Sequence, residues 1–169
     1  MQRITVMAGL VIASTLAGCA QIQLGAPVPS IENIQQAKAA GIVPVALGDF
    51  KLAPGRPLDV DQKVSVRSNA VFSPYGSSFA RYLKETLATD LAAAGLLDPA
   101  SRSVIEAFLV DSQLDVPTGQ AKGLVAARFV VNREGVKVYD KELSASASWQ
   151  APFVGVEAIP AAIEVAPQI

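Results

Sequence analysis

The 169-residue chain contains no histidine and only one cysteine, Cys19. Without imidazole, the sequence excludes Ser-His triads, Cys-His dyads and histidine-based metal sites. It also lacks a Gly-x-Gly-x-x-Gly dinucleotide motif and a Walker phosphate-binding loop. We therefore expect a protein that is not an enzyme and that carries no cofactor and no metal.

Positive charge is scarce as well. The chain has 14 Lys and Arg residues against 15 Asp and Glu residues, which gives a net charge of −1. A phosphate-binding surface needs clustered Lys and Arg, so the composition argues against a nucleic-acid partner. The hydrophobic content of 51% is high enough for a real core, and the length suggests one domain.

The first eighteen residues have the three zones of a bacterial export signal. Arg3 supplies the positive start, residues 4–13 form an apolar run, and Ala17 and Gly18 are small residues before a cleavage site. The apolar stretch is shorter than the ~20 residues that span a bilayer, which argues against a transmembrane helix. We predict a signal peptide over residues 1–18.

Cys19 follows that site directly, in the tetrapeptide Leu16-Ala17-Gly18-Cys19. This arrangement resembles a lipobox, in which the chain is cut between Gly18 and Cys19 and the thiol is acylated. Lipoproteins of this type carry about three acyl chains, and several chains anchor a protein firmly. Ala20 rather than Asp follows the cysteine. By resemblance to enterobacterial sorting, we expect a lipid-anchored protein on the periplasmic side of the outer membrane.

The remaining chain divides into a tether and one domain. Residues 20–30 contain two prolines and a glycine, which oppose regular structure, so 19–30 is predicted as a lipidated tether. Ser30 can cap a short helix over 31–40 that ends at Gly41. Residues 31–169 form the predicted single periplasmic domain.

Two strands and a loop are predicted next. Residues 42–50 form an apolar strand, and Pro44 favours a sheet edge or a strand start because it lacks a backbone donor. Residues 51–62 contain Pro-Gly and are predicted as a loop, and 64–66 as a short strand.

The strongest helix pattern covers residues 78–94. Ser77 or Ser78 can cap it and Gly95 can end it. Its apolar side chains recur every four residues, and we expect them to be buried against a sheet: Phe79, Leu83, Leu87 and Leu91.

Three consecutive strands are predicted over 103–114, 123–132 and 136–149, the last two joined by a hairpin at Gly135. The third strand alternates with a period of two, which indicates one buried face and one wet face. The predicted buried face contains Tyr139, Leu143, Ala145, Ala147 and Trp149.

These elements predict an α+β fold. We expect a mostly antiparallel sheet of four or five strands, with one long helix packed on a face and a short N-terminal helix.

Few residues are candidates for chemistry. Asp111 and Asp115 could form a carboxylate pair for acid–base work, although polar groups at a strand end explain them more simply. Ser77 and Ser78 with Arg81 could hold an anion at a helix N-terminus, although ordinary capping explains the serines.

Two further groups could form a partner surface. Asp140, Glu142 and the serines of 144–148 form one row, which a solvated sheet face also explains. Trp149 and Phe153 could be aromatic anchors, although core packing is the default for both.

Several runs resemble a group of uncharacterised proteobacterial lipoproteins. They are Phe72-Ser-Pro-Tyr-Gly-Ser-Ser-Phe-Ala-Arg-Tyr-Leu-Lys, Ala94-Gly-Leu-Leu-Asp-Pro, Ala126-Ala-Arg-Phe-Val-Val, Val138-Tyr-Asp-Lys and Phe153-Val-Gly-Val-Glu-Ala-Ile-Pro-Ala-Ala. The broader resemblance is to YajG-like outer-membrane lipoproteins, which are similar to the auxiliary lipoproteins of envelope transport systems. It implies a sandwich-like domain at the membrane and no catalytic site.

Members of that group continue past Ile-Pro-Ala-Ala into a long second helix, whereas this sequence has nine residues after Pro160. We expect that stretch to give at most one helical turn and to leave apolar sheet surface uncovered. The sequence favours a non-enzymatic binding or accessory lipoprotein of envelope assembly or transport, with a protein or lipid partner. A structural scaffold without a ligand is the alternative, and a carboxylate-dependent hydrolase is a more remote one.

Overall fold

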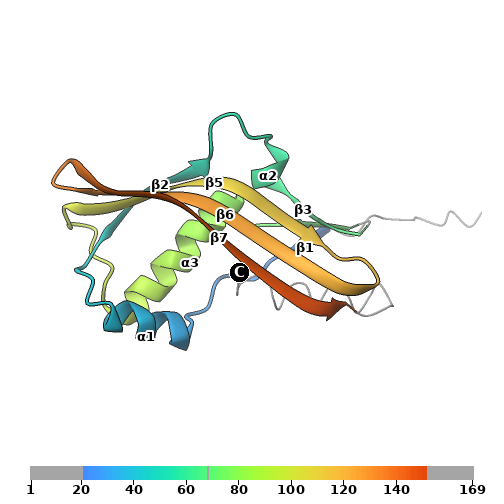
Figure 1. Cartoon of the computed structure of the whole chain (residues 1–169), viewed down its shortest axis with the longest axis horizontal. Coiled ribbons are helices and arrows are strands. Elements are labelled where there is room, and N and C mark those ends of the chain that lie inside the picture. Colours follow the sequence, from blue (N-terminus) through green and yellow to red (C-terminus); the bar gives the residue numbers. More distant parts are fainter. Residues whose placement is uncertain (1–20, 68, 152–169) are drawn as a thin grey trace, which may run out of the picture.

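A computed structural model describes residues 21–67 and 69–151 of the chain (Figure 1). In chain order, the elements are β1 (Gln21–Gln23), α1 (Ile31–Ala39), β2 (Ala46–Leu52), α2 (Asp59–Gln62), β3 (Val64–Val66), β4 (Asn69–Phe72), α3 (Phe79–Ala94), β5 (Ser103–Asp115), β6 (Gly119–Arg133) and β7 (Val136–Ala151).

The larger sheet has four strands in the order β2-β5-β6-β7. β5, β6 and β7 pair antiparallel as successive hairpins, whereas β2 pairs parallel to β5. Gly135 (φ 81°) turns the chain between β6 and β7, as the sequence predicted, because a short hairpin needs a positive φ there. Three long strands joined by short turns therefore form the body of the molecule.

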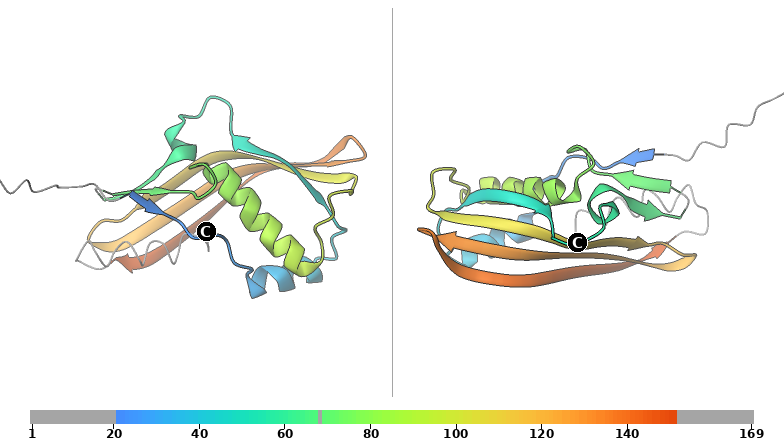
Figure 2. Two further views of the ribbon diagram at one scale, coloured as in Figure 1. Left: turned by 180° about the vertical axis from the view of Figure 1, so that it is seen from behind. Right: turned by 90° about the horizontal axis from the view of Figure 1, so that it is seen from above.

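The smaller sheet has three strands in the order β1-β4-β3, with β1 parallel and β3 antiparallel to β4. Figure 2 shows this sheet and α3 on the same side of the four-stranded sheet. No described element covers the other side of that sheet. The described chain thus has two layers, and one face of its main sheet carries no second layer.

Helices α1 and α3 begin and end where the sequence predicted. The Ser30 side chain accepts from Asn33 N at the start of α1, and Ser78 accepts from Arg81 N at the start of α3. Gly95 ends α3 in the left-handed conformation (φ 74°). Capping residues, together with the apolar periodicity of α3, located both helices to within one residue.

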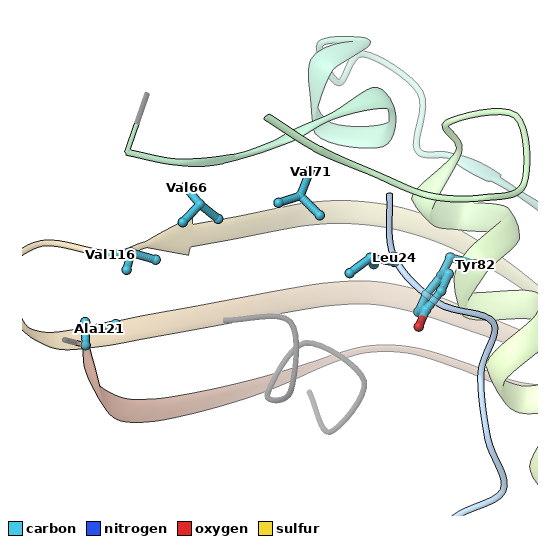
Figure 3. Close-up of a cluster of buried hydrophobic side chains, with 7 residues drawn as sticks. Leu24, Val66, Val71, Tyr82, Val116 and Ala121 are labelled. Carbon is cyan, nitrogen blue, oxygen red and sulfur yellow. The ribbon is translucent and has the colours of Figure 1, made fainter. Parts of the chain in front are cut away.

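The main hydrophobic cluster lies between the small sheet and one end of the large sheet (Figure 3). It joins side chains from both sheets and from α3, so it fixes the two layers to each other. The buried members are Leu24, Val66, Val71, Tyr82, Val116, Ala121 and Ala151.

The predicted fold class is wrong. The chain forms two sheets that both mix parallel and antiparallel pairs, rather than one mostly antiparallel sheet. Its helices are short, with 9, 4 and 16 residues, and none is a long helix covering a sheet face. The physical reason is that β1 and β4 have only three and four residues, too few to show a period-two pattern.

The two predicted buried stripes are also wrong in part. On α3, Leu91 is buried, but Phe79, Leu83 and Leu87 are only half-buried, and Tyr82 is buried instead. On β7, Leu143 (49% exposed) and Ala145 are exposed, and Tyr139, Ala147 and Trp149 are only half-buried. The second layer lies over the other strands and leaves much of β7 uncovered.

Some sequence expectations fall elsewhere. The strand predicted at 42–50 is β2 at Ala46–Leu52, and it does occupy a sheet edge. Strand β1 lies within the predicted tether, and α2 lies within the predicted loop. The expectations for the segment after Pro160 concern residues beyond the described part of the chain.

Asp90 is a buried carboxylate that holds α1 against α3. It accepts hydrogen bonds from Ser30 N and from Asn33 Nδ2, both at 2.8 Å. We expect Asp90→Ala to destabilise the protein by about 1–3 kcal/mol, because it leaves two donors without an acceptor. Chemical denaturation measures this difference. Glu32→Ala is the control, since Glu32 is exposed on α1 and should change stability by under ~0.5 kcal/mol. Equal effects of the two substitutions would contradict the role of Asp90.

Candidate functional site

An apolar cavity of about 100 Å³ lies between α3 and the large sheet. Its walls come from α3, β5 and β6, from Val64 of β3, and from Leu24, which follows β1. The described lining residues are Leu24, Val64, Phe79, Tyr82, Leu83, Thr86, Leu109, Ser112, Gln113, Leu114, Leu124 and Val125.

One face of α3 forms the helical wall of the cavity. Phe79, Tyr82, Leu83 and Thr86 have the i, i+3, i+4, i+7 spacing of a single helical stripe. The sequence pattern had placed part of this stripe in the core. Because the cavity opens along it, Phe79 and Leu83 keep part of their surface accessible.

Three polar side chains around the cavity already have hydrogen-bond partners. Thr86 Oγ1 donates to the Tyr82 carbonyl at 2.9 Å, and Ser112 Oγ donates to the Val60 carbonyl at 2.5 Å. Gln113 Nε2 donates to Asp111 Oδ2 at 2.8 Å. Burial, reinforced by Tyr75, raises the pKa of the Tyr82 phenol, so this hydroxyl stays neutral at physiological pH. These groups favour an apolar occupant.

Asp111 and Asp115 line the same open pocket beside α2, but they are too far apart to act as a catalytic pair. They lie four residues apart on β5, which separates them by about 13 Å along an extended strand. Paired carboxylates in glycoside hydrolases are about 5–9.5 Å apart. Asp115 is exposed, and Asp111 accepts from Gln113. This geometry does not support shared acid–base chemistry.

The N-terminus of α3 already holds a carboxylate. Asp61 Oδ1 accepts from Ala80 N at 2.7 Å and from Ser78 Oγ at 3.1 Å. The anion site considered at Ser77, Ser78 and Arg81 is therefore occupied by a side chain of the protein itself. Sequence reasoning missed Asp61 because it lies in α2, far along the chain from the helix it caps.

Asp140, at one end of the acidic and serine row on β7, belongs to an ion cluster. Asp140 is paired with Arg128 and with Lys137, both at 2.6 Å. Hydrogen bonds from Arg128, and then from Lys137, hold the pKa of Asp140 well below its usual range. Glu142 and Ser144, Ser146 and Ser148 are exposed. Only part of the row is thus a free polar surface.

Trp149 is half-buried against the main hydrophobic cluster, so it is not a free aromatic anchor. Its Nε1 is buried and has no hydrogen-bond partner within the described residues. Phe153, Gly18 and Cys19 lie outside those residues. The predicted lipidation and cleavage sites therefore stay predictions.

Residues 21–67 and 69–151 contain no group of acidic or thiol side chains that could hold a metal ion. No helix among them is long and apolar enough to span a membrane.

Comparison with known proteins shows a likeness of fold. No protein-family model and no curated protein matches the sequence. The crystal structure of protein XCC0632 from Xanthomonas campestris, described under the family DUF330, is similar with a TM-score of 0.54 at 9% identity, over 88% of each chain. The two chains share a fold. At 9% identity, the shared fold does not indicate a shared activity or a shared binding partner.

A second structure, lipoprotein GNA1162 from Neisseria meningitidis, aligns over 86% of this chain and 95% of that chain at 14% identity. Its TM-score of 0.24 is too low to indicate a shared fold. Neither structure is described as YajG-like, so this part of the resemblance stays a prediction.

Proposed function

We propose that the protein is a lipid-anchored, non-enzymatic accessory component of the cell envelope, placed on the periplasmic side of the outer membrane. Its task is to bind a protein partner, and the cavity between α3 and the large sheet receives an apolar side chain of that partner. The apolar cavity is the observation that carries the proposal.

The size of the cavity favours a side chain over a small-molecule ligand. Ligand pockets usually enclose about 300–1,000 Å³, whereas this cavity measures about 100 Å³. An engineered cavity of about 150 Å³ holds one benzene molecule. The space is therefore sized for one small apolar side chain, and a few buried side chains carry most of the binding energy of a protein interface.

Two alternatives have less support. A scaffold without a ligand gives no reason for accessible apolar side chains beside satisfied polar groups. A carboxylate-dependent hydrolase needs convergent acids, and the strand geometry separates Asp111 from Asp115.

Photo-crosslinking in cells tests the proposal with the full-length chain. A benzophenone amino acid is placed at Gln113, an exposed residue beside the cavity. The control position is Gln120, which is exposed on β6 and does not line the cavity. We expect one dominant protein adduct from Gln113 and none of that mass from Gln120.

A second experiment fills the cavity with a larger side chain. Thr86→Phe places an aromatic ring in the space, and we expect it to reduce the Gln113 adduct at least tenfold. The matched control is Thr89→Phe, because Thr89 makes the same kind of intrahelical hydrogen bond, to Glu85, and lies outside the cavity lining. An adduct that survives Thr86→Phe, or an adduct formed with lipid, would refute a protein side chain as the occupant. Many weak adducts at both positions would favour the scaffold.

A further inference from the structure

Among the described strands, β7 is a long, unpaired edge of the large sheet. It pairs with β6 along one side, and no described strand pairs with its other side. The strand has sixteen residues, and Figure 1 shows it along the border of the sheet in orange and red. Unpaired backbone donors and acceptors along such an edge can accept another strand.

The opposite edge is blocked, which makes β7 distinctive. β2 has only seven residues, and its register shifts between Leu47 and Phe50. The Lys84 ammonium also donates to the Gly48 carbonyl at 2.8 Å. Short length, irregular register and a nearby charge are features by which natural proteins prevent pairing at an edge.

The second half of β7 has none of these features. Residues 143–150 contain neither a charge nor a proline, and they alternate serine with apolar residues. Their pairing with β6 is regular, since the register shift on this hairpin lies at the other end, between Val131 and Asn132. Residues 141–146 are exposed at every position, so both faces of the strand are accessible there.

We propose that β7 pairs antiparallel with β7 of a second copy of this chain. A two-fold axis perpendicular to the sheet passes through the segment Ser144–Ser146, and the two four-stranded sheets continue into one. This surface is separate from the cavity, and the inference does not rest on the proposed function.

The charges along β7 exclude axes at residues 137 and 139–142 and are compatible with this register. Opposed residues in such a pair point to the same face, so each position faces one an even number of residues away. A two-fold axis at Asp140, at Lys141 or at Glu142 would place that residue directly opposite the same charged residue of the second copy. An axis within 144–146 opposes no like charges, and at Ser146 it places the exposed Leu143 opposite Trp149 of the second copy. A second copy can therefore pair along this edge without placing like charges opposite each other.

Cysteine crosslinking tests the pairing in membranes that contain the full-length chain. Ser144→Cys and Ser146→Cys place a thiol near the axis, and the parent chain with its own Cys19 gives the background. Val136→Cys is the matched control, since it is exposed on the same strand but lies more than ~45 Å from its copy in this arrangement. We expect disulfide-linked dimer at one or both serine positions, at least tenfold above the Val136 variant. Equal crosslinking at all three positions, or none at any, overturns the proposal.

Association in detergent supplies an independent measurement. We expect the full-length chain to sediment as a dimer, and the double variant Ser144→Lys/Ser146→Lys to dissociate at least tenfold more readily because four lysines meet near the axis. The control is Thr118→Lys/Gln120→Lys, which adds the same charge at exposed positions outside β7. A monomeric parent chain, or equal dissociation of both double variants, overturns the proposal.

Discussion

Replacement of Cys19 by alanine is expected to move most of the protein from the membrane fraction to the soluble periplasmic fraction. The expected reason is loss of the acyl chains, since each buried methylene contributes about 0.8 kcal/mol to membrane binding. About three chains anchor a protein firmly, so removing all of them should change the membrane-bound fraction by more than tenfold. Cell fractionation followed by immunoblotting measures the distribution.

The control for this substitution is Ser68→Ala, which leaves the predicted lipobox intact and should stay with the membrane. Mass spectrometry of the parent protein should show a first residue at Cys19 that carries the mass of the acyl chains. A Cys19→Ala product of mature size that stays fully in the membrane fraction would disprove lipid anchoring through this residue.

Replacement of Leu109 by alanine is expected to destabilise the fold by about 2–5 kcal/mol. Leu109 lies on the central strand β5, its side chain is only 1% exposed, and it is among the largest fully buried side chains. Deleting three buried carbons loses their transfer free energy and enlarges the adjoining cavity. Equilibrium unfolding of the full-length chain in denaturant measures the difference.

Two other leucine-to-alanine substitutions provide the comparison with Leu109→Ala. Leu58 is 68% exposed, and Leu58→Ala should cost under ~0.5 kcal/mol. Leu87 is half-buried on α3, so Leu87→Ala should fall between the two. Costs that do not follow this order would show that burial within the described fold does not govern stability at these positions.

Much of the local structure could be predicted from the sequence because it depends on residues close in the chain. Ser30 and Ser78 cap their helices through hydrogen bonds that span three residues. Gly135 turns a hairpin between two neighbouring strands. The alternation along β7 also identified a strand correctly, although not which of its faces is covered.

The candidate site required contacts between distant parts of the chain. The cavity combines Leu24, α3 and two long strands, and no local pattern indicates that their side chains leave a space between them. Asp61 was missed for the same reason, since its carboxylate caps a helix about twenty residues later. The stripe on α3 was visible in the sequence, but periodicity cannot tell a fully packed face from one that borders a cavity.

The sequence by itself determined the predicted export and lipidation signal, the absence of histidine chemistry and the positions of the longer elements, because each depends on composition or on neighbouring residues. Only the tertiary structure decided that β1, β3 and β4 form a second sheet, that β2 is parallel to β5, and that β7 is an edge strand of the described sheet. These features depend on non-local pairing and on where the second layer lies, and a period of two specifies neither.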